Sequence, residues 1–415
     1  MKMRSILFVS IAFPPKSDAE GLQVAKYLKY LLREGSAQFN IDAVTSRQPT
    51  LNMSYDASLE KNTKGVRQTI EIPIYENRYT NYLLRKLAPW TLNRPDSKYS
   101  FYWQVNKVIK QLSHKPDIIY SRSFPLSSAL MAYKLKQHYQ VPWVMHLSDP
   151  WTLNPIHSMR YSRNWNDKAE EKCFESADLI SVTSEKTMQN YQRKYPEFAK
   201  KIKITPNVFD TEAYIDKPYK IKEKIKIIYT GGLAEKRTPT FLINAFETLK
   251  KLYPNIAKDY QILFAGGLDR KNKTFFLQCD HPEIQHIGML SLQQVLELQK
   301  EADILLLIDT PIKTSKDAQF FPSKLLDYML AKRRLLALTD AGSTTWEVIQ
   351  ENKLGDSIAY HDEKSLVQCL ISIWEAWKKE ELAYFSTDKL NKFYSSHVNA
   401  KKLCQYFSRL CHEKK

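Results

Sequence analysis

The 415-residue chain is poor in cysteine and contains no long hydrophobic run. Its five cysteines are an odd number, lie far apart, and form neither a C-x-x-C pair nor zinc-ligand spacing with the nine histidines. Such usage is typical of a reducing compartment, so we expect a cytoplasmic protein. No apolar run approaches the roughly 20 residues that a membrane-spanning helix needs, and we expect any membrane contact to be peripheral.

The first residues also lack a secretory cleavage site. The stretch "MKMRSILFVSIAFPP" has a charged head and a short apolar run, but the run ends in Pro-Pro without an A-x-A-like site. We interpret this run as a first β-strand.

The remaining composition is that of a globular protein with unevenly distributed charge. The chain is 43% hydrophobic and 26% charged, and its length favours two or three domains. The formal net charge is +17, and residues 1–215 hold 31 Lys/Arg against 20 Asp/Glu. A basic surface of this kind attracts phosphate on a lipid, a nucleic acid or a nucleotide. Because no nucleic-acid recognition motif is found, we expect no nucleic-acid partner.

Basic and aromatic residues are concentrated in residues 77–115. This segment holds eight Lys/Arg and one acid, Asp96, together with several aromatic and leucine side chains. The mixture suits peripheral contact with an anionic membrane. The alternative is a solvated basic helix with an ordinary core face.

Short apolar runs alternate with amphipathic helical patterns along the whole chain, which predicts an α/β fold with parallel strands. The alternation pauses in the polar stretch "PNVFDTEAYIDKPYKIKEK". We therefore predict two doubly wound domains, residues 1–212 and 213–385, and a C-terminal helix, residues 386–415, that could pack back on the first domain. Two such domains can present the carboxyl ends of their strands to a central cleft, where open sheets bind ligands.

Three motifs in the second predicted domain offer anion-binding chemistry. "YTGGLAEKR" follows a predicted strand with two glycines and two cations, and "ILFAGG" repeats the strand and glycine turn. "QFFPSKLLDYMLA" places Ser323 and Lys324 at the mouth of a helix and Asp327 one turn inside it, where backbone N–H groups attract anions. Each motif alone has an ordinary explanation as a turn or a helix cap. Together they fit one nucleoside diphosphate.

The first predicted domain offers a carboxylate beside aromatic surface. "PWVMHLSDPW" places His146 and Asp149 at the end of a predicted buried strand, followed by Trp151. A stacking ring and a carboxylate suit sugar hydroxyls, whereas the alternatives are a structural histidine and an acid that caps a helix. The loop "FPPKSDAEG" leads into a helix near Gly21, and it either closes over a ligand or caps that helix through Ser17 or Asp18.

These motifs give the chain a resemblance to the retaining glycosyltransferases of family 4, in particular the group that builds bacterial surface polysaccharides. The most specific element is "FFPSKLLDYMLAKRRLLAL", supported by "ILFVSIAFPP", "PWVMHLSDPW", "KITPNVFD", "YTGGLAEKR" and "ILFAGG". The resemblance implies the GT-B fold, in which two Rossmann-like domains face a central cleft, the first binding the acceptor and the second the donor. It also implies transfer of a sugar from a nucleotide-diphosphate sugar to a glycan or lipid-linked acceptor, with retained configuration and without a cofactor or bound metal.

The resemblance assigns roles to individual residues. It implies catalytic roles for Asp149, His146 and Arg237, and it assigns Arg237, or its neighbour Lys236, to neutralise the leaving diphosphate. The implied donor-binding residues are Gly231, Gly232, Lys236, Arg237, Gly266, Gln319, Phe321, Pro322, Ser323, Lys324 and Asp327. The implied acceptor-binding residues are Ser17, Gly21, Arg122 and Trp151. No residue matches a nucleophile for double displacement, so we expect the front-face route, in which the leaving diphosphate helps to deprotonate the acceptor hydroxyl.

The chain departs from the family pattern at four positions. Gln319 replaces the first acid of the E-x7-E element, and Asp327, which matches its second acid, is one methylene shorter than the usual Glu. Gly232 stands where many relatives carry an Arg, and His146 lies two residues from the histidine of other branches. Three alternatives therefore remain: a non-catalytic nucleotide-sugar-binding subunit of an assembly complex, a GT-B epimerase, and a nucleic-acid binder, which no motif supports.

Overall fold

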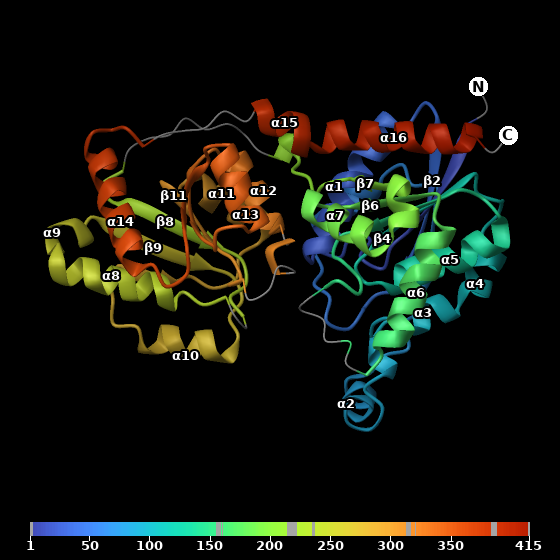
Figure 1. Ribbon diagram of the computed structural model, residues 1–415, viewed down its shortest axis with the longest axis horizontal. Coiled ribbons are helices and arrows are strands. Elements are labelled where there is room, and N and C mark those ends of the chain that lie inside the picture. Colours follow the sequence, from blue (N-terminus) through green and yellow to red (C-terminus); the bar gives the residue numbers. More distant parts are fainter. Residues whose placement is uncertain are drawn as a thin grey trace. The chain divides into compact units, whose positions relative to one another are not determined.

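The computed structural model describes residues 3–154, 159, 161–213, 222–234, 237–312, 317–319, 321–382 and 388–413. It divides into two compact units. The first comprises Met1–Val208 and Phe393–Lys415, and the second comprises Phe209–Lys392. Figure 1 shows that each unit is built on its own sheet with helices packed against it.

The first unit is built on a parallel sheet of seven described strands in the order β3-β2-β1-β4-β5-β6-β7. Each strand is a short, mostly buried apolar run, because helices cover both faces of such a sheet. Alternate residues serve the two faces, so Ile6 and Phe8 enter one hydrophobic cluster while Leu7 and Val9 enter the other. The strands are β1 (Arg4–Val9), β2 (Phe39–Ser46), β3 (Gln68–Ile72), β4 (Ile118–Ser123), β5 (Trp143–Leu147), β6 (Leu179–Val182) and β7 (Ile202–Ile204).

The helices of the first unit include one from the far end of the chain. Its α-helices are α1 (Ala19–Glu34), α2 (Arg78–Leu87), α3 (Ser100–Trp103), α4 (Val105–Gln111), α5 (Ser127–Tyr139), α6 (Arg163–Ser176), α7 (Glu185–Lys194) and α16 (Ser396–Glu413). Short 3₁₀ segments are η1 (Ala57–Thr63), η2 (Thr91–Asn93) and η3 (Pro196–Lys201). Figure 1 shows α16, in red, running alongside α1, and the two helices are in contact.

The second unit repeats the same strand order. Its six described strands, all parallel, follow the order β10-β9-β8-β11-β12-β13. They are β8 (Ile225–Thr230), β9 (Tyr260–Ala265), β10 (Ile284–His286), β11 (Ile304–Ile308), β12 (Arg334–Leu338) and β13 (Gly355–Ile358). The helices are α8 (Thr240–Leu252), α9 (Pro254–Ala257), α10 (Arg270–Gln278), α11 (Leu292–Lys300), α12 (Ser323–Ala331), α13 (Thr344–Glu351), α14 (Glu363–Lys378) and α15 (Asp388–Tyr394), with the 3₁₀ segments η4 (Thr211–Ala213) and η5 (Asp317–Gln319).

This strand order places one topological switch point in each sheet. The chain winds outward in one direction from β1 and in the other from β4, and likewise from β8 and β11. Loops at the carboxyl ends of such a pair leave in opposite directions and open a crevice where α/β sheets bind ligands. The fold thus directs attention to the residues that follow β1, β4, β8 and β11.

None of the described helices is both long enough and apolar enough to cross a bilayer.

The contact of α16 with the first unit predicts a strong stability effect. Phe407 is fully buried, and its ring centroid lies 6.0 Å from that of Phe39 and 5.3 Å from that of Tyr120. We expect Phe407→Ala to lower the free energy of unfolding by about 3–5 kcal/mol, because it removes these contacts and leaves a cavity. Val398→Ala on the same helix, where Val398 is 40% exposed, should change it by less than about 1 kcal/mol. Chemical denaturation measures both, and equal effects would contradict the docked position of α16.

Candidate functional site

Two glycine turns shape the carboxyl edge of the second sheet. Gly231 follows β8 with a φ of +125°, and Gly266 follows β9 with a φ of +138°, both in the region that favours glycine. A Cβ at Gly266 would lie 2.2 Å from the Gly231 carbonyl oxygen, and one at Gly231 would lie 2.6 Å from Lys324 Nζ. Side chains at these positions would therefore displace the backbone or the lysine.

Lys324 is the centre of this edge. It lies in the first turn of α12, and its ammonium donates a hydrogen bond of 2.7 Å to the Tyr229 hydroxyl and sits 4.1 Å from the ring centroid. The same hydroxyl donates to the Gly232 carbonyl at 2.9 Å. Burial and, to a smaller extent, the charge of Arg237 lower the pKa of Lys324 to about 7, although Asp309 opposes the shift. Two cations thus act on one another here, and an anion would stabilise both.

Asp309 is a site residue that the sequence reasoning missed. It follows β11 at the switch point, is 6% exposed, and accepts hydrogen bonds from Thr345 Oγ1 at 2.6 Å and from the Thr310 N–H at 2.8 Å. Burial raises its pKa although these hydrogen bonds and Arg237 oppose the shift. The signal was present in "ILLLID", an acid that directly follows a buried apolar strand.

The predicted helix mouth is found at α12. Pro322 occupies the N-cap position and Ser323 is the first helical residue, so the free backbone N–H groups of the first turn lie beside Lys324. Asp327 is one turn further along the same face of the helix. Phe321, Pro322, Ser323 and Asp327 are all partly exposed.

The other residues predicted to bind the sugar donor differ in their burial. Gln319 is 2% exposed and ends the 3₁₀ segment η5. Arg237 is partly exposed, and its charge acts on Lys324. Lys236 lies outside the described residues. The second unit thus brings Gly231, Gly232, Gly266, Arg237 and Lys324 to one edge of the sheet, together with the start of α12.

In the first unit, Arg122 lies at the centre of a buried polar cluster. It is fully buried on β4, forms an ion pair of 2.9 Å with Glu20, and donates to Ser148 Oγ at 3.4 Å. Its guanidinium also lies 4.6 Å from the ring centroid of Tyr27. Burial raises the pKa of Glu20, while the neighbouring guanidinium opposes that shift. Glu20 was not predicted, because only the fold brings α1 against β4.

His146 is a buried neighbour of Arg122 on the adjacent strand. Its Nδ1 lies 2.9 Å from Ser181 Oγ, and its Nε2 is buried without a hydrogen-bond partner among the described residues. Burial, aided by the charge of Arg122, lowers the pKa of His146 well below its usual value, so the imidazole is neutral near pH 7. A histidine in this environment fits a positioning role better than direct contact with a substrate.

The loop after β5 carries Asp149 and is anchored by Trp151. Asp149 is partly exposed, whereas Trp151 is fully buried, with its indole N–H donating to Asn166 Oδ1 at 2.8 Å. Its backbone N–H donates to the Tyr191 hydroxyl at 2.7 Å. The ring therefore fills the core instead of presenting a stacking surface.

The remaining predicted acceptor residues lie at the start of α1. Asp18 caps this helix by accepting from the Gly21 N–H at 2.9 Å, so of the two capping candidates the structure uses Asp18. A Cβ at Gly21 would lie 2.3 Å from the Lys16 carbonyl oxygen, which explains the glycine by packing. Ser17 is partly exposed, and its N–H donates to the Ser54 carbonyl at 2.9 Å.

Comparisons with known proteins bear on these two units. Residues 24–213 match the model of Glycosyltransferase Family 4. The alpha-1,3/1,6-mannosyltransferase Alg2 of Schizosaccharomyces pombe is 23% identical over 269 residues, which cover 56% of this chain and 52% of that protein. Sucrose-phosphate synthase from Thermosynechococcus elongatus has a TM-score of 0.69 at 13% identity, covering 99% of this chain and 100% of that one. Residues 24–213 are therefore similar to Glycosyltransferase Family 4.

The fold of the chain is GT-B, as the resemblance implied. Anabaena HepE in complex with UDP-glucose, another similar structure, has a TM-score of 0.59 at 14% identity and matches 99% of this chain and 98% of its own. At such identities these structures show the fold alone. The sequence match spans about half the length of Alg2.

The low pKa of Lys324 predicts unusual chemical reactivity for this side chain. Below about pH 7 the ammonium is charged and unreactive toward acylating reagents, and above it the free amine reacts. Competitive acylation followed by mass spectrometry should give a midpoint near pH 7 for Lys324 and near 10 for exposed lysines. Arg237→Gln should raise the Lys324 midpoint, because it removes a neighbouring cation. A wild-type midpoint near 10 would show that Lys324 is solvated.

Proposed function

We propose that the chain is a retaining glycosyltransferase that moves a sugar from a nucleotide-diphosphate sugar to a glycan or lipid-linked saccharide in bacterial surface polysaccharide synthesis. The observation that carries this proposal is the pair Lys324 and Arg237 beside the N-terminus of α12, at the switch point of the second sheet. The similar fold of HepE, which was solved with UDP-glucose, supports a donor of the same class.

The diphosphate of the donor would neutralise the charge gathered at this edge. In the proposal its oxygens accept from the N–H groups of the first turn of α12, from Ser323 and from Lys324, while Arg237 supplies the second cation. Asp327 accepts hydrogen bonds from the ribose hydroxyls. Binding an anion favours the charged form of Lys324, so donor binding near pH 7 is accompanied by proton uptake.

These groups also promote departure of the nucleotide. When the bond between the anomeric carbon and the phosphate oxygen breaks, negative charge grows on that oxygen, and the fixed cations stabilise it. In the front-face route the departing diphosphate oxygen accepts the proton of the acceptor hydroxyl, whose oxygen forms the new bond on the same face of the sugar. Sugar configuration is retained without a covalent enzyme intermediate.

The first unit supplies the acceptor side of the proposal. Asp149 is the carboxylate that we assign to contact sugar hydroxyls. The contacts of Arg122 with Glu20 and Ser148 hold the loop that carries Asp149. Buried His146 extends this support through Ser181. Trp151 serves as the anchor of the loop and Gly21 as a packing position beside Lys16, whereas Ser17 stays near the surface.

A second candidate function is a non-catalytic nucleotide-sugar-binding subunit. Gln319 favours it, because a buried amide stands where the family places a carboxylate, and an amide cannot stabilise developing positive charge on the sugar. Both candidates predict donor binding, and they differ in turnover.

Donor binding is tested by a thermal-shift panel of UDP, GDP, ADP and CMP with their common sugars. We expect one nucleoside diphosphate to stabilise the protein selectively, with Lys324→Met and Asp327→Ala each weakening its affinity about tenfold or more. Lys364→Met, which changes an exposed lysine on α14, is the matched control and should bind as wild type. Absence of a shift with every nucleotide would exclude the donor site.

We also propose peripheral contact with an anionic membrane through residues 77–115, at the cytoplasmic face. Helix α2 exposes apolar and aromatic side chains beside its cations, and Lys86 lies 4.6 Å from the ring centroid of Tyr82. Such a mixture buries its apolar side in the headgroup region while the cations attract anionic lipids. The exposed side chains of α2 are Tyr79 (82% exposed), Tyr82 (57%), Leu83 (54%) and Leu87 (74%). Trp90 (41%) and Trp103 (61%) are exposed further along the same segment.

Vesicle sedimentation tests this contact. Wild type should bind phosphatidylglycerol vesicles, bind phosphatidylcholine vesicles weakly, and dissociate in 0.5 M salt, in keeping with screening of exposed charges. The double change Tyr82→Ser and Leu83→Ser should reduce binding about fivefold or more, because it removes buried apolar area. Leu277→Ser in α10, where Leu277 is 78% exposed, is the control. Equal binding by all three proteins would place the membrane surface elsewhere or nowhere.

A further inference from the structure

A pocket of about 420 Å³ lies in the first unit beside α2. Its walls come from four stretches of chain: Asn52, residues 81–97, residues 124–126 and Met159. Phe124 and Leu126 directly follow β4, so one wall of the pocket is the carboxyl edge of the first sheet at its switch point. The pocket belongs to the first unit, whereas the proposed donor-binding edge belongs to the second.

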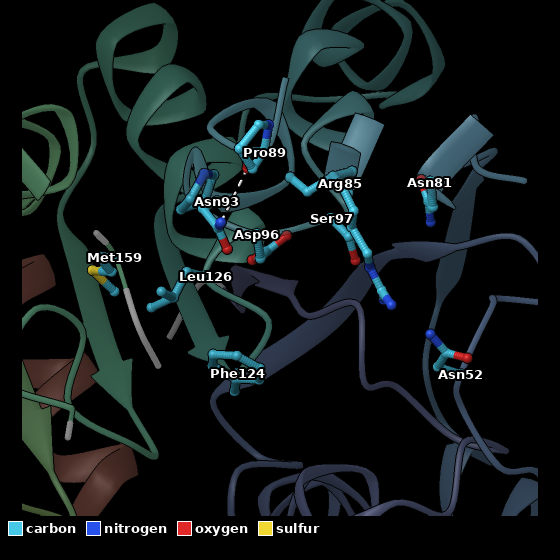
Figure 2. Close-up of a pocket in the computed structure, with 12 residues that line it drawn as sticks. Asn52, Asn81, Arg85, Pro89, Asn93, Asp96, Ser97, Phe124, Leu126 and Met159 are labelled. Carbon is cyan, nitrogen blue, oxygen red and sulfur yellow. Dashed lines mark hydrogen bonds between the residues drawn. The ribbon is translucent and has the colours of Figure 1, made fainter. Parts of the chain in front are cut away.

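The polar side of this pocket has an amide that makes no hydrogen bond to the described residues. Asn81 is 9% exposed, and its side chain makes no hydrogen bond among the described residues. In Figure 2 the Asn81 amide, the Asn52 amide and the Arg85 guanidinium gather on one side of the pocket. Because Asn81 lines the pocket, its amide is placed to exchange hydrogen bonds with a ligand or solvent there.

The carboxylate in the pocket wall already accepts hydrogen bonds from the protein. Asp96 accepts hydrogen bonds from the Ser127 N–H at 2.9 Å, from Ser127 Oγ at 2.7 Å and from the Lys98 N–H at 2.8 Å. These contacts hold it at the start of α5. The charge that remains for a ligand is the cation of Arg85, which makes no ion pair among the described residues. Arg85 is exposed, and its guanidinium is available to an anionic group of a ligand.

The opposite side of the pocket includes apolar side chains. Figure 2 shows Leu126 and Met159 on the side away from Asn52 and Asn81, where Asn93 and Asp96 also lie, and Phe124 at the edge between the two sides. Amides that both donate and accept, opposite an apolar wall, match a sugar ring, which has hydroxyls around its edge and C–H bonds on its faces. A guanidinium matches phosphate through paired hydrogen bonds.

We propose that this pocket binds a saccharide that carries a phosphate group. Asn52 and Asn81 bind the sugar hydroxyls, Arg85 binds the phosphate, and the Phe124 side contacts the sugar face. The proposal rests on the proposed function, since it makes the pocket the acceptor subsite. Exposed apolar residues of α2 stand next to Arg85 along the helix, so a lipid chain on the phosphate has an apolar surface to follow.

The test is isothermal titration with hexose 1-phosphates, the matching methyl hexosides, inorganic phosphate and short-chain prenyl-diphosphate sugars. Four proteins are compared: wild type, Asn81→Leu, Arg85→Gln and the control Lys86→Gln, which removes a charge from the same helix outside the pocket. A parallel titration with the stabilising nucleoside diphosphate reports on the donor site independently.

We expect sugar phosphates to bind wild type and Lys86→Gln equally, and to bind Asn81→Leu and Arg85→Gln about tenfold more weakly. Methyl hexosides and inorganic phosphate should each bind more weakly than the sugar phosphate, and tighter binding of the prenyl compounds would identify a lipid-linked source. Binding that is absent, or equal in all four proteins, overturns the proposal. If Arg85→Gln and Lys86→Gln instead impair only vesicle binding, Arg85 belongs to the membrane surface and the proposal fails. In either case, nucleotide binding that is unchanged in the variants would still support the donor site of the second unit.

Discussion

Every described strand in both sheets runs parallel to its neighbours, and this constraint decides where the polar chemistry of the chain can lie. Parallel strands are buried on both faces, so polar side chains are costly within them and collect where the strands end. The shared order places a switch point beside β1 and β4 in one unit and beside β8 and β11 in the other. Gly231 and Asp309 follow one pair, and Phe124 and the pocket beside α2 follow β4.

In the second unit this edge brings the cationic side chains of Lys324 and Arg237 near each other. Two glycines let the backbone turns approach each other, and Lys324 fills the space above Gly231. Desolvation and Arg237 make the charged form of Lys324 unfavourable, as its pKa of about 7 records. A diphosphate would supply the missing counter-charge, and cations placed where negative charge develops lower the barrier for a departing anion. In the first unit, by contrast, the buried cation Arg122 is already paired with Glu20.

Much of this fold follows from local sequence patterns, while the side-chain partners do not. Alternating apolar runs and helical patterns predict two doubly wound units, and the glycine pairs and the Pro-Ser-Lys helix start predict one edge of the second sheet. Asp309 and Glu20 were missed because their partners, Thr345 and Arg122, are distant in sequence and meet only through crossovers. Trp151 was predicted to stack on a sugar, but a tryptophan that follows a strand can equally point into the core. Here its ring is buried in the core and its indole N–H donates a hydrogen bond to Asn166.

The central claim is that this chain turns over the donor it binds, and proton NMR of the donor tests it most directly. The stabilising nucleotide sugar is incubated with the protein, and the anomeric signals are followed in time, with water as the acceptor and then with a prenyl-diphosphate saccharide. The account predicts consumption of the donor, release of nucleoside diphosphate, and a first-formed sugar product with the anomeric configuration of the donor, all lost in Lys324→Met. A donor that binds and stays unchanged would contradict the account and identify a binding subunit, and an epimerised sugar without any acceptor would identify an epimerase.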